Sequence, residues 1–219
     1  MKRYFIPVLM LITIKSYAQK HNWEYGFQVG ININSAYGTA VSKDYKSILP
    51  GLGIGGHIQY NLSNHIGITA MPQYDQNGWS YRNLTFASSS GGVFDTGDVL
   101  IKRNYLNLPI LATYTTGKKI KFTIGTGVFF GLLLSNHFIV KIKEPTTSST
   151  KSNSSSAKSF NFGIAANASI QIPLRQKLKL IIGIHDNYGF VNTNKTTPPY
   201  ISTIKTNALS LITGLTLPL

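Results

Sequence analysis

Few residues in this chain have the type and spacing that catalysis or metal binding requires. Cysteine is absent, which excludes thiol catalysis and cysteine-based metal sites. No histidine belongs to a close ligand pattern such as H-E-x-x-H, so the sequence predicts neither a metal site nor a cofactor. The five histidines are His21, His57, His65, His137 and His185.

A nucleophilic enzyme would need a hydroxyl beside a histidine base that a carboxylate orients. His185 and Asp186 are adjacent, and adjacent residues of a strand point to opposite faces, so they form no dyad. Ser135 and His137 would share one strand face, and they are the one candidate pair for a lipid-modifying enzyme. A single pair does not make a motif. We therefore predict that the chain is not an enzyme, assign no catalytic residue, and keep the lipid-modifying enzyme as the alternative.

Glycines cluster at Gly51–Gly56 and Gly125–Gly127, in a way superficially similar to nucleotide-binding loops. A phosphate site of that kind needs a helix that begins directly after the glycines. No helical pattern follows either cluster. The glycines are better explained as small residues on the crowded inner face of a small barrel.

The elements that would position all these residues are strands, and the stretch from Trp23 to Asn34 is the clearest of them. Its odd positions are apolar and its even positions are polar or glycine. Successive side chains of a strand point to opposite faces, so this stretch has one apolar and one polar face. Its length suits a strand that crosses a bilayer in a barrel.

Eight segments share this alternation, and all are longer than the ~5–6 residues usual for strands in soluble proteins. They are Trp23–Asn34, Leu52–Asn61, Ile66–Asp75, Val99–Thr115, Ile120–Ser135, Phe160–Ile172, Leu178–Phe190 and Lys205–Leu219. The predicted fold class is all-β, an eight-stranded antiparallel up-and-down transmembrane β-barrel.

The connections between these segments alternate between short and long. Short turns are expected at Leu62–His65, Thr116–Lys119 and Leu174–Lys177, and long loops at Ser35–Gly51, Gln76–Asp98, Asn136–Ser159 and Val191–Ile204. Outer-membrane barrels have this pattern, with tight turns in the periplasm and long loops outside the cell. Within the third long loop, the low-complexity run Pro145–Lys158 is expected to be disordered.

Alternation alone does not say which face points outward, because a lipocalin or a soluble sandwich turns its polar face to the solvent. Three features favour the membrane orientation. The polar face is rich in small residues, the apolar face lacks charge, and aromatic residues lie near strand ends as in interfacial girdles. The aromatic residues are Trp23, Tyr25, Tyr60, Tyr74, Trp79, Tyr81, Tyr114, Phe160 and Tyr188.

An eight-stranded barrel has an interior that side chains just fill, which argues against a wide pore. Since a buried charge without a partner is costly, we predict an inward charge network in which Glu24 and Asp75 offset the cations. We also expect His57 and His185 to meet as a hydrogen-bonded interior pair. The inward set is Glu24, His57, Asp75, Arg103, Lys121, Lys179 and His185.

The first 18 residues have the features of a secretory signal peptide, with Lys2 and Arg3, an apolar run from Tyr4 to Ile14 and a small residue at position 18. We expect cleavage after Ala18, so that residues 19–219 form the barrel domain in the outer membrane. The net charge is +14, yet only 13% of residues are charged, against about 25% in soluble domains. This balance favours anionic lipid headgroups over nucleic acid as the partner.

Basic residues in or near the long loops are expected to bridge lipopolysaccharide phosphates. They are Lys43, Lys46, Arg82, Lys141, Lys143 and Lys195.

A more specific pattern lies in Arg103–His137, RNYLNLPILATYTTGKKIKFTIGTGVFFGLLLSNH. An aromatic-Leu-x-apolar-Pro strand at Tyr105–Pro109 is followed by the basic turn Gly117–Lys119 and the glycine-rich strand Gly125–Phe129. Together with Asn187-Tyr188-Gly189, this resembles the PorT-like outer-membrane β-barrel proteins of Bacteroidetes. The resemblance implies an eight-stranded outer-membrane barrel. Most such proteins have no assigned activity, and the namesake assists a secretion system for surface proteins.

We therefore expect an outer-membrane protein with a structural or interaction role, at the surface or in secretion, that acts as a monomer. The expected partners are outer-membrane lipid, lipopolysaccharide, the barrel-assembly machinery, and secretion or surface proteins.

Overall fold

The computed structural model describes residues 23–39, 44–87, 94–142, 147–152, 157–175, 177–195 and 203–218. The predicted signal peptide, residues 1–18, lies outside these ranges. Every regular element within them is a β-strand, and no described segment is a helix long and apolar enough to cross a membrane.

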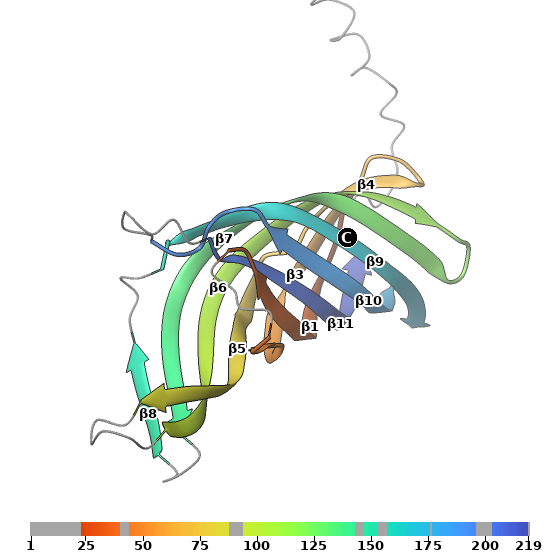
Figure 1. Cartoon of the computed structure of the whole chain (residues 1–219). Helices are drawn as coiled ribbons and strands as arrows, with labels where there is room; N and C mark the ends of the chain where they lie inside the picture. Colours follow the sequence, from red (N-terminus) through yellow and green to blue (C-terminus); the bar gives the residue numbers. More distant parts are fainter. Residues whose placement is uncertain are drawn as a thin grey trace, which may run out of the picture.

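The strands form one sheet that closes on itself (Figure 1). They are β1 (Trp23–Tyr37), β2 (Lys46–Ser47), β3 (Leu49–Asn61), β4 (Ile66–Ala70), β5 (Gln73–Ala87), β6 (Phe94–Thr116), β7 (Lys121–Ile142), β8 (Thr147–Ser152), β9 (Phe160–Arg175), β10 (Leu178–Gly189) and β11 (Lys205–Pro218). The ring runs β1, β3, β4 with β5, β6, β7, β9, β10, β11 and back to β1, and every pairing is antiparallel. With β4 and β5 counted as one strand, the predicted eight-stranded barrel is confirmed.

β4 and β5 are two parts of one predicted strand, separated at Met71 and Pro72. Both parts pair with β3 and β6 in one continuous register. Proline lacks the N–H that a ladder needs, which explains the gap. Gly56 N donates to Pro72 O at 2.8 Å and Met71 N donates to Pro109 O at 3.0 Å, so the wall stays closed there.

The wall is apolar outside and polar inside, the reverse of a soluble protein. Phe27 and Ile31 on β1 are 54% and 57% exposed, whereas Gln28 and Asn32 are 2% and 1% exposed. Leaving such a surface in water would cost roughly 25 cal/mol for each Å². The membrane orientation of the alternation is therefore the one that the structure has.

The connections give the barrel two distinct ends. At the short-turn end, residues 62–65, 117–120 and 176–177 join β3 to β4, β6 to β7 and β9 to β10. At the opposite end, the long-loop end, β5, β6, β7 and β8 extend away from the rest of the barrel (Figure 1).

The strands at the long-loop end are longer than the sequence predicted. β5 continues to Ala87 and β6 begins at Phe94, so most of the predicted loop Gln76–Asp98 is sheet. β8 pairs with β7 inside the run Pro145–Lys158, which was expected to be disordered. Both loop predictions were wrong because pairing with a neighbouring strand can stabilise a segment whose composition alone favours a loop.

Two apolar clusters lie inside the ring. The outer core, at the long-loop end, consists of Ala36, Trp79, Val99, Ile101 and Ile204, with Tyr81, Leu84, Phe86 and Val140 packed against it. The inner cluster consists of Met71, Leu111, Phe129 and Ala165.

Candidate functional site

A polar cavity of about 270 Å³, the mouth cavity, lies at the short-turn end. Strand alternation turns one polar side chain of each neighbouring strand into it. Its lining residues are Glu24, Gln59, Asn61, Ser63, Asn64, Thr115, Lys121, Gln171, Lys179 and Pro218.

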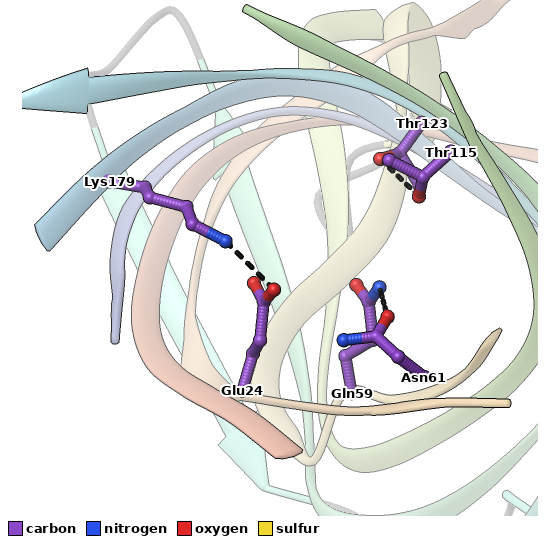
Figure 2. A network of polar contacts seen from close by, with 6 residues as sticks. All are labelled: Glu24, Gln59, Asn61, Thr115, Thr123 and Lys179. Carbon is purple, nitrogen blue, oxygen red and sulfur yellow. Dashed lines mark hydrogen bonds and ion pairs between the residues drawn. The ribbon is translucent and has the colours of Figure 1, made fainter. Parts of the chain in front are cut away.

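An ion pair between β1 and β10 spans this cavity, and Figure 2 shows its two side chains pointing toward each other. Lys179 Nζ lies 2.8 Å from Glu24 Oε1, and the side chains are 18% and 6% exposed. It is the one ion pair found among the residues that the structure describes. This part of the predicted charge network is confirmed.

The rest of the mouth cavity holds neutral pairs and free polar groups. Gln59 Nε2 donates to Asn61 Oδ1 at 2.7 Å, and the hydroxyls of Thr115 and Thr123 lie 3.0 Å apart (Figure 2). Lys121 lines the cavity, inward as predicted, and no described carboxylate pairs with it. Since Glu24 Oε2 and Gln59 Oε1 are buried without a hydrogen-bond partner, the cavity suits water or a small polar solute.

Further along the interior, Asp75 is the centre of a network of amides that we call the amide plug. Its carboxylate accepts from Gln73 Nε2 at 2.8 Å, Asn107 Nδ2 at 2.6 Å and Asn32 Nδ2 at 3.1 Å. Gln28 Nε2 extends the plug by donating to Gln73 Oε1 at 3.1 Å. The prediction that Asp75 offsets a cation was wrong, because these three amide donors solvate the charge.

Glycines leave the room that the amide plug fills. A Cβ added at Gly53 would lie 2.7 Å from Asp75 Oδ1, and one at Gly131 would overlap Asn107 Oδ1. A methyl group does not fit there without a shift of its neighbours, so side chains fill this part of the cross-section. For Gly53 the interpretation as a packing glycine is confirmed, and the filled interior opposes a wide pore.

Arg103 points inward as predicted, but neutral groups surround it instead of carboxylates. Its Nε donates to Asn136 Oδ1 at 3.1 Å, its Nη1 to Thr193 Oγ1 at 2.6 Å and its Nη2 to Asn194 Oδ1 at 2.6 Å. The guanidinium carbon lies 4.8 Å from the ring centre of Trp79. Pairing with Glu24 or Asp75 was therefore the wrong prediction, because neutral oxygens and an aromatic face stabilise this cation.

These contacts hold two connections onto the long-loop end, and we call them the Arg103 latch. Thr193 N and Oγ1 donate to Ile204 O at 2.8 and 2.9 Å. Lys158 N donates to Thr193 O at 2.8 Å. No sequence pattern identifies Thr193 and Asn194 as partners, since both lie in a segment that looks like an ordinary loop.

The two inward histidines are not bonded to each other. His185 Nε2 lies 3.0 Å from Asn187 Oδ1, and His57 Nε2 has no hydrogen-bond partner. The predicted pair was wrong because the register places His57 opposite Gly26 and His185 opposite Ser210.

The candidate hydrolase pair is not assembled either. A register shift next to Asn104 turns Ser135 and His137 to the outer face, opposite Asn104 and Lys102. Ser135 Oγ accepts from Asn104 Nδ2 at 2.8 Å. In the described ranges no histidine ring bonds a hydroxyl, and no cluster of three His, Asp or Glu could hold a metal ion.

Most of the predicted aromatic girdle is exposed on the outer wall. The exposed residues are Trp23, Tyr25, Tyr114, Phe160 and Tyr188. Two members differ: Tyr81 packs against the outer core, and Trp79 is 2% exposed and belongs to it. Its parity could have revealed this, since Trp79 shares the odd positions of β5 with the inward Gln73 and Asp75.

Comparison with known proteins agrees with this architecture. A family model described as outer membrane protein beta-barrel domain matches residues 17–195. The chain belongs to this family. It is thus an outer-membrane β-barrel protein. No curated protein sequence matches it.

Similar solved structures are distant in sequence. Ail of Yersinia pestis is 12% identical with a TM-score of 0.42, and the match covers 90% of this chain and 99% of Ail. Neisserial surface protein A is 13% identical with a TM-score of 0.44, over 89% and 97%. OprG of Pseudomonas aeruginosa is 11% identical with a TM-score of 0.47, over 91% and 97%.

Proposed function

We propose that this protein is a non-conducting outer-membrane barrel that presents a fixed β-sheet platform to a partner at the cell surface. The long-loop end then faces outward, which is the usual orientation of such barrels. The platform consists of the parts of β5, β6 and β7 beyond the lipid-facing wall, together with β8.

The observation that carries this proposal is that the sheet continues far past the apolar wall. On the outer face of β5, Tyr74 is followed by Gln76, Ser80 and Arg82, so the strand leaves the lipid after Tyr74. The strand nevertheless remains in the sheet to Ala87, backed by the outer core and the Arg103 latch. A surface that is already ordered loses less conformational entropy on binding than a flexible loop does.

Membership among the PorT-like proteins of Bacteroidetes is part of the proposal. The two halves of the motif face each other, with Pro109 opposite Phe129 and Leu111 opposite Gly127. Leu111 and Phe129 are each 1% exposed and lie in the inner cluster. The motif is a packing unit of the barrel, which supports the assignment and, through it, a role in the secretion of surface proteins.

The proposal has further parts that follow from an outer-membrane position. The chain is exported with cleavage after Ala18, is placed by the barrel-assembly machinery, acts as a monomer and contacts lipopolysaccharide. Enzymatic activity and nucleic-acid binding are not included. Among the described residues the Ser135 hydroxyl is bonded to Asn104 and not to His137, which counts against the lipid-modifying enzyme.

Trimming the platform tests its role. Residues 85–96 are replaced by Asn-Gly, which joins the opposed residues Leu84 and Gly97 through a two-residue turn. We expect a folded barrel by circular dichroism and thermal melting, and secretion of surface proteins reduced to the level of a deletion strain. Glu24→Gln, at the opposite end, is the matched control and should secrete normally. Full secretion by the folded trimmed variant would refute the platform.

Planar-bilayer recording tests the non-conducting part separately. We expect no steady single-channel steps from the full chain, because the amide plug fills the interior. Reproducible steps that scale with protein would contradict the proposal.

A further inference from the structure

The wall of the barrel has one seam, where β3 and β5 separate on the way to the long-loop end. Their ladder ends at Gly53 opposite Asp75. Beyond it β3 pairs only with β1 and β5 only with β6, until β2 meets β5 again at Ser47 opposite Ser80. The seam is thus bounded by residues 48–52 on one side and 76–79 on the other.

A side chain replaces the missing ladder at the seam. Asn34 Nδ2 donates to Leu49 O at 3.0 Å on one side and to Gln76 O at 2.9 Å on the other. It reaches across because Gly51 carries no side chain; a Cβ there would lie 2.8 Å from Asn34 Nδ2. The seam is therefore closed from inside by this amide and by the close approach of Gly51 to Gln76 O, which an added Cβ would overlap, and it is left hollow on its outer side.

Two hollows meet at the seam on the outer surface, and the first extends from it across β1 to β11 and to Ile182 of β10. The first, the trough, has a volume of about 570 Å³ and an apolar lining that includes Val29, Ile31, Leu52, Ile54, Tyr74 and Leu211. The second, the upper pocket, has a volume of about 440 Å³ and lies between residues 48–50 and Ser80, Arg82, Asn83, Asp98, Leu100 and Lys141. Leu52 lines the trough and Pro50, the next outward residue of β3, lines the upper pocket, so the two hollows lie end to end.

Basic side chains surround the upper pocket and its junction with the trough. Arg82 and Lys141 line the pocket, and exposed Lys102 lies opposite Gly78, beside the seam. None of these three cations forms an ion pair with a described carboxylate. The one carboxylate of the pocket, Asp98, accepts a hydrogen bond from Asn83 N at 3.0 Å. The pocket therefore retains a net positive charge.

The trough is apolar and the upper pocket is basic. They meet at the level where the outer wall of the barrel changes from apolar to polar side chains. On β6 the outward series runs from Leu106 through Asn104 to Lys102, and on β5 it runs from Tyr74 to Gln76. A molecule that fits both hollows needs a hydrocarbon chain on the membrane side and a phosphate on the outer side. Ammonium and guanidinium groups are the side chains that bind phosphate most strongly.

We propose that this seam is a binding site for one phosphorylated, acylated glycolipid of the outer leaflet, the lipid A part of lipopolysaccharide. One acyl chain lies in the trough and a glucosamine phosphate contacts Arg82 and Lys141, with Lys102 beside it. The inference rests on the proposed orientation, in which the long-loop end faces outward. It gives the general contact with lipopolysaccharide a defined place on the barrel.

Native mass spectrometry of the full chain in neutral detergent, titrated with purified lipid A, tests the site. We expect one saturable lipid per chain, about tenfold weaker binding for Arg82→Ala/Lys141→Ala, and a similar loss for Leu211→Trp, which fills the trough. The matched controls are Lys118→Ala/Lys119→Ala at the short-turn end and Leu132→Trp on the β7 part of the wall. Both controls should bind as the unchanged protein does.

Three outcomes would overturn the proposal. Equal losses in the test and control variants would show general adhesion of lipid to the wall. Equal binding of lipid A without its phosphates would remove the role of the cations. Competition by inorganic phosphate at the concentration at which lipid A binds would reduce the seam to a simple anion site. Because these measurements use purified protein, they can succeed or fail independently of the secretion assay.

Discussion

At the short-turn end the barrel holds one ion pair and a cavity of about 270 Å³, whereas at the long-loop end apolar side chains close around Trp79. Both groups of residues point inward from the same ring of strands. The two ends of the ring are thus filled by different kinds of side chain, with the amide plug and the inner cluster between them.

The difference shows where the surroundings of the wall change. Within the lipid, apolar side chains are as well placed on the outside as on the inside, so Asp75 and Asn107 can share the interior with the inner cluster while Leu106 faces out. Beyond the lipid the wall stands in water, and burial of Trp79 and Ile101 becomes favourable again. On β5 the inward side chain is the charged Asp75 at one position and the apolar Trp79 four residues later.

The largest effect is expected from Trp79→Ala. Trp79 is 2% exposed and lies in the outer core, so its loss should lower the free energy of unfolding by about 3–5 kcal/mol. Denaturant unfolding in lipid vesicles, followed by circular dichroism, measures the change. Trp23→Ala, which removes a 47% exposed tryptophan at the other end, should cost clearly less. Equal costs would mean that the two ends are stabilised in the same way.

Arg103→Ala should come next. It removes the donor that Arg103 supplies to the oxygens of Asn136, Thr193 and Asn194, and we expect the free energy of unfolding to fall by about 3 kcal/mol. Arg103→Lys should recover only part of the loss, because an ammonium cannot reach three divergent acceptors at once.

Protease cleavage within residues 191–204 separates this latch role from general stability. The Arg103→Ala variant should be cut faster at this connection while the strands of the wall stay protected. Unchanged cleavage would show that Arg103 does not hold the connection.

Asp75→Asn tests the amide plug that lies between the two ends. The amides of Asn32, Gln73 and Asn107 all donate to the Asp75 carboxylate. The NH2 group of the new asparagine would face at least one of these donors, and we expect the free energy of unfolding to fall by about 2 kcal/mol. Thermal melting in detergent measures the loss. No loss would mean that the charge of Asp75 contributes nothing to the plug.

The smallest effect is expected at the mouth cavity. A double-mutant cycle of Glu24→Gln and Lys179→Met should give a coupling energy of about 1 kcal/mol or less, because Lys179 is partly exposed. The coupling should fall further in 1 M salt. A coupling energy larger than the stability lost in Arg103→Ala would mean that polar contacts contribute more at the short-turn end than at the long-loop end.

The alternation of apolar and polar residues was enough to predict which side chains face the lipid and which face the interior. It was not enough to predict which inward side chains lie at the same level of the barrel and contact each other. Leu106 and Asn107 have the orientations that their parity predicts, and so do all the inward charges. An odd or even position in a strand does not show how far along the barrel axis a residue lies, or toward which neighbouring strand its side chain is directed. For this reason Asp75 was paired with a cation, although the register places it opposite Tyr105.

Composition misled the prediction at the long-loop end. Polar and glycine residues made Gln76–Asp98 look like a loop, yet Asn77, Trp79 and Tyr81 continue the alternation of β5. The shift between Tyr81 and Leu84, and the one beside Asn104, depend on strand pairing that one strand alone does not reveal. The latch partners Thr193 and Asn194 could not be predicted, because their contact with Arg103 joins residues about 90 positions apart in the chain.

The pairing of β1 with β11 has a consequence for the order of assembly. Glu24 lies opposite Pro218 and Tyr37 opposite Lys205, so the first described strand is hydrogen-bonded along its length to the last. Until β11 arrives, β1 is an open edge, and an open edge in hydrocarbon leaves a full row of N–H and C=O groups without partners. The barrel is therefore stable in the bilayer only with β11 in place, and a chain that ends before β11 would be expected to leave this edge unpaired in lipid.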